Sequence, residues 1–196
     1  MSNTTLFTEG ERVTLAEMLE VREKRVAIQR ELLSSQKEDS LLMALMNIPG
    51  PIKNNQQLEA VFAAVLERIE EVLGNDLPQA SLFRNLKTGA EYFILSPLTP
   101  AQLKEKMVTI EETHPFGRLF DLDVLWMEGN ELKSISRTEL GLNTRRCFIC
   151  NRDAKDCGRS RRHTIEEMQE AISKIIQEGS DQLHDYRNPF YGNGLA

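Results

Sequence analysis

Residues 117–126 read GRLFDLDVLW, an apolar run that two aspartates interrupt. In a β-strand, side chains alternate between the two faces, so Asp121 and Asp123 share one face, about 7 Å apart, while Phe120 and Leu122 share the other. Aspartate is uncommon in strands, and two like charges on one wall need open water, basic side chains or a metal ion beside them. The stretch therefore predicts a strand with one buried face and one acidic face.

The segments around this strand have the periodicity and capping signals of an α+β protein. In chain order we expect a helix from Thr14 to about Leu33, a buried strand in SLLMALMNIPGPIKNN (40–55) that ends in the Pro-Gly-Pro turn, and a helix from about Asn54 to Gly74. Strands at 80–86 and 91–96 follow, and then a helix from Thr99 that stops before Pro115. Strands at 118–126 and 131–136 and a last helix capped by Thr164 and Glu167 complete the order. The central order of strand, helix, strand, strand, helix, strand predicts a ferredoxin-like split βαβ core. An extra N-terminal helix precedes this core, and a Cys/Arg-rich segment with a helix follows it.

The chain is expected to form one domain over residues 1–196, because its length is ordinary for a domain and no internal repeat divides it. We expect the core at about 12–140, the Cys/Arg-rich tail and its helix at about 141–180, and poor order or loose docking at 181–196. No apolar run approaches the ~20 residues that cross a bilayer, and the start of the chain lacks the layout of a secretion signal. Three cysteines argue against a disulfide framework, so a cytoplasmic location is expected.

Charge is distributed unevenly along the chain. The formal net charge is −6, yet residues 145–163, RRCFICNRDAKDCGRSRRH, contain seven Arg and Lys against two Asp and carry +5. The remaining chain has 17 basic and 28 acidic residues. An acidic protein with one basic segment favours a local anionic partner over a general nucleic-acid coat, and neither a membrane nor a nucleic acid is expected as partner.

The aspartate pair is the first candidate site. Mg²⁺ prefers hard oxygen ligands and is usually bound by one or two carboxylates together with substrate phosphates, so Asp121 and Asp123 are candidate magnesium ligands and catalytic residues. The alternative is that both face solvent on an edge strand. Arg118 just before the pair, and Arg137 after the following hairpin, favour a phosphate site.

Two other groups of residues could bind anions. In PGPIK (49–53), a tight turn at Gly50 leads into a helix N-terminus, and Lys53 adds a full charge; a plain connecting turn is the alternative. In the first helix, Arg22 and Arg25 form a stripe beside the expected apolar face; a solvated edge is the alternative. The expected apolar face consists of Leu15, Met18, Leu19, Val26, Leu32 and Leu33.

The basic segment also contains three cysteines and a histidine. Cys147, Cys150, Cys157 and His163 could close a tetrahedral zinc site, which would fix the arginine-rich segment onto the last helix. The alternative is reduced thiols that are packed or idle, because free cysteine is usually a small buried hydrophobe.

His114, in THPFGR, is a candidate for assisting deprotonation of an incoming hydroxyl, because imidazole titrates near neutral pH. The alternative is that it only closes the preceding helix.

Four fragments in order, PGPIK, HPFGRLFDLDVL, ISR and RRCFICNRDAKDCGRSRRH, resemble the holo-acyl-carrier-protein synthase of citrate lyase, also called apo-citrate lyase phosphoribosyl-dephospho-CoA transferase. The resemblance extends from about Thr14 to the final helix. It implies transfer of the phosphoribosyl-dephospho-CoA group of 2'-(5''-triphosphoribosyl)-3'-dephospho-CoA to a serine of the apo acyl carrier (gamma) subunit of citrate lyase, with release of diphosphate. Since the resemblance covers this chain without the precursor-making module of fused relatives, we expect another protein to make the precursor.

Combining this reaction with the residues gives a mechanistic hypothesis. Asp121 and Asp123 would hold Mg²⁺ against the triphosphate, and cationic side chains would bind the other phosphate oxygens. The candidates for that second role are Lys53, Arg22, Arg25, Arg118 and Arg137. The basic segment, which begins at Arg145 and Arg146, would dock the acidic carrier or bind the CoA phosphates.

Two other functions remain alternatives at this point. A zinc-knuckle nucleic-acid binder would use the basic Cys/His segment, although the acidic remainder and few aromatic residues argue against it. A noncatalytic assembly factor of the lyase would bind the carrier without modifying it.

Overall fold

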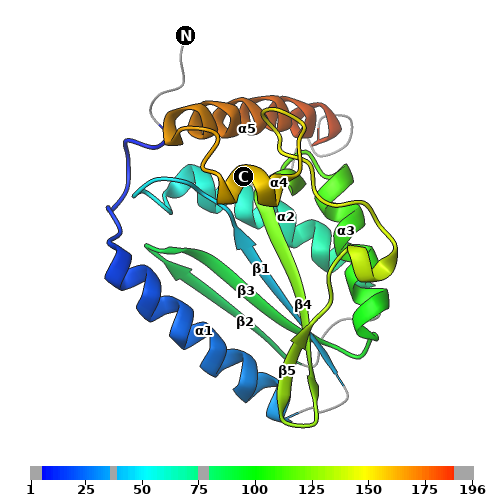
Figure 1. Cartoon of the computed structure of the whole chain (residues 1–196). Helices are drawn as coiled ribbons and strands as arrows, with labels where there is room; N and C mark the ends of the chain where they lie inside the picture. Colours follow the sequence, from blue (N-terminus) through cyan, green and yellow to red (C-terminus); the bar gives the residue numbers. More distant parts are fainter. Residues whose placement is uncertain (1–5, 36–38, 75–79, 188–196) are drawn as a thin grey trace, which may run out of the picture.

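The computed structural model describes residues 6–35, 39–74 and 80–187 as a mixed α+β protein (Figure 1). Its antiparallel sheet has five strands in the order β2-β3-β1-β4-β5. The strands are β1 (Ser40–Met46), β2 (Ala80–Leu86), β3 (Gly89–Ser96), β4 (Phe120–Glu128) and β5 (Glu131–Ser134). The helices of these described parts are α1 (Leu15–Ser35), α2 (Gln56–Leu73), α3 (Pro100–Thr113), α4 (Ala154–Arg159) and α5 (Ile165–Arg187).

The register of β4 against the central strand β1 confirms the two-faced pattern predicted for residues 120–125. Asp121 lies opposite Leu45 and Asp123 lies opposite Met43, so both carboxylates are on the face of the sheet that α1 partly covers. Phe120 and Leu122 point to the other face and are fully buried. The alternation of a strand therefore separates an acidic wall from the main core.

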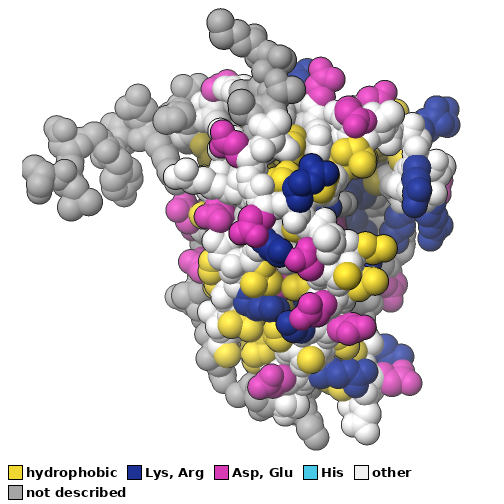
Figure 2. All heavy atoms as spheres, turned by 90° about the vertical axis from the view of Figure 1, so that its left-hand side faces the viewer, with side chains coloured by type: hydrophobic (Ala, Val, Ile, Leu, Met, Phe, Trp, Pro, Cys, Tyr) yellow, Lys and Arg dark blue, Asp and Glu magenta, His cyan; other side chains and the backbone are white. Residues whose placement is uncertain are grey.

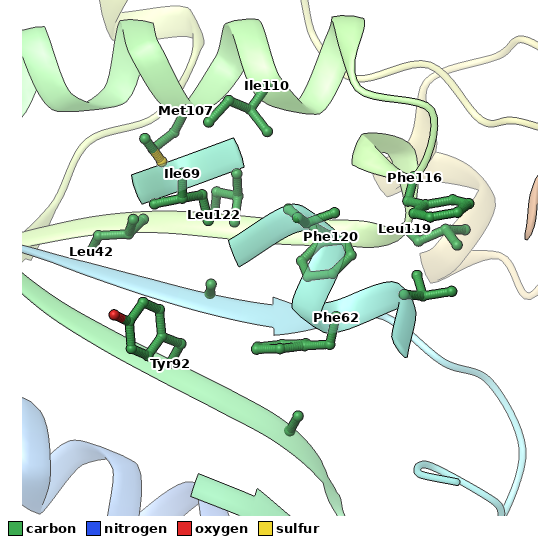
Figure 3. Close-up of a cluster of buried hydrophobic side chains, with 14 of the residues drawn as sticks. Leu42, Phe62, Ile69, Tyr92, Met107, Ile110, Phe116, Leu119, Phe120 and Leu122 are labelled. Atoms are coloured by element: carbon green, nitrogen blue, oxygen red, sulfur yellow. The ribbon is translucent and has the colours of Figure 1, made fainter. Parts of the chain in front are cut away.

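The main core lies between the sheet and helices α2, α3 and α5. Its largest side chains include Phe62 of α2 and Phe120 of β4, whose ring centroids are 5.3 Å apart. Figure 3 shows these rings together with Tyr92 of β3 and Met107 of α3 in one cluster. Ile172 of α5 is also completely buried in it, so the last helix is part of the core and not an appendage.

Helix α1 covers the opposite face, and the sequence-based prediction of its apolar face was wrong in part. Leu33 is fully buried as expected, but Leu15, Leu19 and Val26 are exposed. The face that packs on the sheet also contains Gln29, whose side-chain amide contacts the sulfur of Met43. Figure 2 views this side of the molecule and shows hydrophobic and charged side chains intermixed on it.

A buried ion-pair network explains why α1 turns a polar stripe toward the sheet. Glu91 of β3 is completely buried, and its two carboxylate oxygens accept from Arg25 of α1 at 2.6 Å and from Arg84 of β2 at 3.0 Å. Such a charge needs full pairing in a dry environment. The face containing Arg25 therefore packs inward, which leaves part of the apolar stripe exposed.

Local capping signals predicted the starts of α1, α3 and α5 correctly. Thr14 and Glu17 exchange capping hydrogen bonds at α1, Thr99 and Gln102 form a capping box at α3, and Thr164 and Glu167 do so at α5. The start of α2 was predicted one residue early, because its N-cap is Asn55.

Other boundaries differ from the prediction in small ways. Strand β4 begins at Phe120, after a 3-10 turn at Gly117–Leu119, and β5 ends at Ser134. The short helix α4 was not predicted; Asp153 caps it by accepting from the amides of Lys155 and Asp156.

Helix α5 continues to Arg187, and the rest of the segment expected to be poorly ordered, 188–196, lies outside the described residues. Among the residues described, no helix is long and apolar enough to cross a membrane.

Candidate functional site

Both aspartates line one cavity of about 410 Å³ at the outer edge of β4. Helix α3, strand β4 and the segments around residues 134–138 and 144–155 supply the walls. The cationic side chains in the lining are Lys104, Arg137, Arg145 and Lys155, and the anionic ones are Glu111, Asp121, Asp123 and Asp153. The strand, its neighbouring helix and the Cys/Arg-rich segment thus meet at one charged site.

The cavity exists because β5 is too short to cover the whole edge of β4. Pairing with β5 begins at Leu125, so the backbone of Leu122 has no strand partner on that side. Two buried side chains of α3 replace the strand: Lys104 donates to the carbonyl of Leu122 at 2.6 Å, and Glu111 accepts from its amide at 3.0 Å. Pairing of these buried backbone groups fixes both side chains beside the aspartates.

Asp121 is held by an arginine from the basic segment. Arg145 donates to Asp121 Oδ1 at 2.7 Å and to the carbonyl of Phe120, and it lies 3.5 Å from Glu111 Oε2. Arg137 pairs with Glu111 and, at 2.7 Å, with Glu112. Arg137, which was predicted to bind the triphosphate, and Arg145, which was predicted to dock the carrier or bind the CoA phosphates, both reach the cavity, where the protein's own carboxylates orient them.

Asp123 differs from Asp121 in having no ion pair within the described part of the chain. Desolvation raises the pKa of Asp123 above its ordinary value, Lys104 opposes this increase, and the carboxylates of Asp121 and Glu111 add to it. Desolvation likewise lowers the pKa of Lys104, with the nearby Glu111 and Asp123 opposing. The pair thus consists of one carboxylate held by arginine and one available to a ligand.

A second cavity of about 170 Å³ adjoins the first, and Asp121 lines both. Arg22, Arg25 and Lys53 line it as well, so the structure brings together these three cations predicted from separate segments. Arg25 also forms the ion pair with Glu91 described above. Lys53 donates to the carbonyl of Ile48 at 2.5 Å, and burial, together with Arg22, lowers its pKa.

Gly50 does not line either of these cavities. Its φ of +88° requires glycine, and a Cβ there would lie 2.6 Å from Gln169 Nε2 of α5. Gln169 also donates to the carbonyl of Pro49 at 3.2 Å. Gly50 therefore lies in a turn that packs against α5, which agrees with the alternative of a connecting turn and does not support the predicted anion site at Gly50.

A third cavity, of about 550 Å³, lies on the other side of the basic segment. Arg118 and Arg146 line this cavity and not the one that contains Asp123, whereas Arg145 reaches both. Arg118 donates to the carbonyl of Arg146, and its Nε is buried without a hydrogen-bond partner. Burial, with Arg145 and Arg137 nearby, lowers the pKa of Arg118. Apolar lining residues include Phe148, Ile149, Ile165 and Met168.

The cysteine cluster adjoins this third cavity. The ligand atoms of Cys147, Cys150, Cys157 and His163 all lie within 4.8 Å of one another. Cys150 Sγ is 3.4 Å from Cys157 Sγ and 3.2 Å from His163 Nε2, and all three cysteines are free thiols. The structure thus brings together the four residues that the sequence nominated for zinc.

His114 lines none of these three cavities. It ends α3, its amide donates to the carbonyl of Ile110, and its Nδ1 accepts from the amide of Phe116 at 3.1 Å. Burial lowers its pKa, so the ring is neutral near pH 7. In this structure its contacts are those of a helix C-cap.

Sequence reasoning missed Lys104 and Glu111. Both belong to a helix whose apolar positions were recognised, and their spacing of seven residues places them on one face beside that apolar stripe. This spacing was the available signal, but which charged face meets a strand edge depends on tertiary packing.

Residues 13–179 match the family model described as apo-citrate lyase phosphoribosyl-dephospho-CoA transferase. A probable apo-citrate lyase phosphoribosyl-dephospho-CoA transferase of Streptococcus pyogenes is 46% identical over 176 residues, covering 90% of this chain and 91% of the relative. A relative of the same name from Vibrio cholerae is 37% identical, with 89% and 93% covered. Protein CitXG of Haemophilus influenzae is 35% identical, but only 37% of its length is matched.

Proposed function

The chain belongs to the apo-citrate lyase phosphoribosyl-dephospho-CoA transferase family, and on that premise we propose how it carries out the transfer. It is a transferase that attaches the prosthetic group to apo-citrate lyase. The substrate is 2'-(5''-triphosphoribosyl)-3'-dephospho-CoA, and the acceptor is a serine of the acyl carrier (gamma) subunit. The serine oxygen forms a bond to the α-phosphorus, the bond from that phosphorus to the bridging oxygen breaks, diphosphate leaves, and the hydroxyl proton is lost to a base or to water.

The observation that carries the assignment of the site is the shared cavity of Asp121 and Asp123 beside Lys104, Arg137 and Arg145. A triphosphate needs both cationic side chains and a hard cation to offset its charge. Arginines already oriented by carboxylates could turn to phosphate oxygens with little loss of side-chain entropy.

The donor set at this cavity fits a magnesium ion. Both candidate ligands are carboxylate oxygens, and the Asp123 carboxylate forms no ion pair among the described residues. We propose that Asp121 and Asp123 hold the ion. When bound, it would neutralise the charge that builds on the α-phosphoryl oxygens and on the leaving diphosphate.

Lys53, Arg22 and Arg25, at the adjoining cavity, are proposed to bind the phosphates that extend past Asp121. The route between the two cavities is supported by Asp121, which lines both. Binding phosphate on both sides of the reacting phosphorus would hold it in line with the serine hydroxyl, which is how most of the acceleration arises in phosphoryl transfer.

The finer fold assignment and the cellular location are proposals as well. We infer a ferredoxin-like core, supported by the order β2-β3-β1-β4, in which each of the two helical crossovers leads to a strand two positions away. A single domain is supported by α5 packing into the main core. Free thiols and a CoA-derived substrate favour the cytoplasm.

The decisive test is the intact mass of the apo carrier subunit after incubation with this protein, the triphosphoribosyl substrate and Mg²⁺. We expect a mass gain equal to phosphoribosyl-dephospho-CoA, with one diphosphate released per carrier. Adding EDTA should abolish both the mass gain and the diphosphate release. Metal analysis of the EDTA-treated protein should show that any zinc content is unchanged, so that the effect is due to removal of Mg²⁺. An unmodified carrier that binds the protein would favour an assembly factor instead. The nucleic-acid-binding alternative is not favoured by the family relationship.

A further inference from the structure

Three thiols and an imidazole converge on one point in the basic segment. For tetrahedral zinc with Zn–S near 2.3 Å and Zn–N near 2.0 Å, the ligand atoms lie about 3.8 Å apart for two sulfurs and about 3.6 Å apart for sulfur and nitrogen. The observed separations run from 3.2 Å and 3.4 Å for two pairs to at most 4.8 Å for any pair, so they bracket these values. We propose that Cys147, Cys150, Cys157 and His163 bind one structural Zn²⁺.

The surroundings of the ligands have the features of a metal site's outer shell. The backbone amide of Arg152 donates to the Cys150 sulfur, and the amide of Cys147 donates to the carbonyl of Arg152 at 2.7 Å, which closes a tight turn over residues 147–152 that contains the first two cysteines. Asn151 takes the left-handed conformation (φ 57°) that this turn requires. Amides that point at a cysteine sulfur stabilise the thiolate that binds metal.

The imidazole of His163 lies between a cysteine sulfur and a carboxylate. Its Nε2 faces Cys150, and its Nδ1 lies 3.9 Å from the carboxylate of Glu167, the residue that also caps α5. This distance is too long for a hydrogen bond, so Glu167 places a negative charge behind the ring without fixing its tautomer. The proposed zinc ligand is thus next to the first turn of the last helix.

Apart from the polar contacts of Arg145 and Arg146 and the packing of Phe148 on the core, little burial holds this segment in place. Residues 141–144 are all exposed, α4 has only six residues, and Cys157 is its one buried residue. A piece this short cannot bury enough apolar surface to offset the loss of chain entropy, so a metal is the usual source of the missing stability.

The position of the zinc site gives it a role in the proposed function. Arg145 and Arg146 immediately precede Cys147; Arg145 pairs with Asp121, and the carbonyl of Arg146 accepts from Arg118. The metal would thus hold Arg145 at the cavity that we assign to the triphosphate. The role of the metal in holding Arg145 at this cavity rests on the proposed function, whereas zinc binding itself does not.

The test begins with metal analysis of protein purified without chelator in the presence of zinc. We expect about one Zn²⁺ per chain. The matched variants are Cys150→Ser and His163→Ala, which should lose the metal, and His163→Cys, which should keep it because thiolate replaces imidazole as the fourth ligand. Arg159→Gln, in the same segment but not a ligand, is the control and should keep the metal.

A second measurement uses wild-type protein, so it does not depend on whether the variants fold. Wild-type protein stripped of metal and titrated with Co²⁺ should develop the thiolate charge-transfer and tetrahedral d–d absorption bands, saturating at one equivalent, and Zn²⁺ should abolish them. Metal-free wild-type protein that forms no cobalt–thiolate bands, or a His163→Ala variant that retains full zinc, would overturn the proposal. If zinc binds as described but the carrier is never modified, the proposed function fails and the zinc site stands.

Discussion

The two neighbouring aspartates of β4, Asp121 and Asp123, are expected to have opposite effects on the stability of the folded protein. Asp121 pairs with Arg145 at 2.7 Å, whereas desolvation and two nearby carboxylates raise the pKa of Asp123. A carboxyl whose pKa is raised in the folded state contributes stability below its unfolded pKa, and this contribution is lost as the pH rises through the folded value. We therefore expect the ionised Asp123 to reduce stability at neutral pH, a cost that fits the metal-binding role proposed for it.

We predict that Asp123→Asn reduces transfer to the carrier by at least about 100-fold, the loss that follows removal of one group stabilising developing charge. The same variant should unfold at an equal or higher temperature than the wild type at pH 7, because Asn cannot ionise. The stability difference should shrink as the pH falls toward the ordinary Asp value of 3.8. Diphosphate release and thermal unfolding across this pH range check both parts.

The matched control is Asp121→Asn, which should also lose activity but should be less stable than the wild type by up to about 1 kcal/mol, because the ion pair with Arg145 is broken. Wild-type diphosphate release by Asp123→Asn with Mg²⁺ present would refute the metal role assigned to the pair.

Glu91 shows the other outcome for a buried carboxylate, in which the charge is fully paired. We predict that Glu91→Ala lowers the free energy of unfolding by about 3 kcal/mol, because Arg25 and Arg84 are left largely buried without a partner. Urea denaturation measures the change. Glu23→Ala, on the exposed side of α1, should change it by no more than about 0.5 kcal/mol. Equal effects of the two substitutions would contradict the role given to the network.

At the scale of elements, two helical glycines have opposite expected effects. A Cβ at Gly179 of α5 would overlap the Phe116 ring, whereas a Cβ at Gly158 of α4 would meet nothing within 4 Å. We predict that Gly179→Ala costs about 1–3 kcal/mol by overpacking. Gly158→Ala should instead stabilise by up to about 1 kcal/mol, because alanine favours the helix. Urea unfolding of the two variants checks the signs, and a stabilising Gly179→Ala would contradict the close packing of α5 on the loop after α3.

Helices that begin with a local capping pair could be predicted from the sequence, whereas the short helix α4 could not. The caps at Thr14, Thr99 and Thr164 depend on residues three positions apart, so they can be read from the sequence. Helix α4 is only six residues long and begins at a lone Asp153 cap, without a periodic apolar pattern. The exposed face of α1 was mispredicted because its packing depends on Glu91, about 66 residues away.

At the scale of the whole molecule, the acidic chain carries one basic segment, and this asymmetry should steer an acidic carrier subunit. We predict that the KM for the apo carrier rises severalfold between about 0.05 and 0.3 M salt while kcat changes little, because screening weakens long-range attraction but not chemistry within the cavity. Steady-state kinetics with the carrier varied at saturating nucleotide measures the two constants.

The variant that tests this interpretation is the double charge reversal Arg159→Glu with Arg162→Glu, two exposed positions of the basic segment. It should raise the KM for the carrier and reduce its dependence on salt, with the KM for the nucleotide unchanged. A variant in which the nucleotide KM rises instead would assign these arginines to the CoA phosphates.

The residues of the candidate site could be nominated from the sequence, but the way they group in space could not. The face shared by Asp121 and Asp123 follows from strand alternation, and the Cys/His set follows from four residues within 17 positions. Arg118 is next to the aspartates in sequence, yet it lies in the cavity beside the cysteines. Arg145, 24 residues from Asp121, is the arginine that reaches it.

By itself, the sequence determined the family, the order of the elements and the acidic face of β4, because motifs, caps and alternation depend on residues close together in the chain. Only the tertiary structure decided which charges meet. The short β5 leaves an edge that Lys104 and Glu111 of α3 must satisfy, and this brings their charges beside Asp123. Such contacts arise from hydrogen-bonding needs across elements, and no spacing along the chain encodes them.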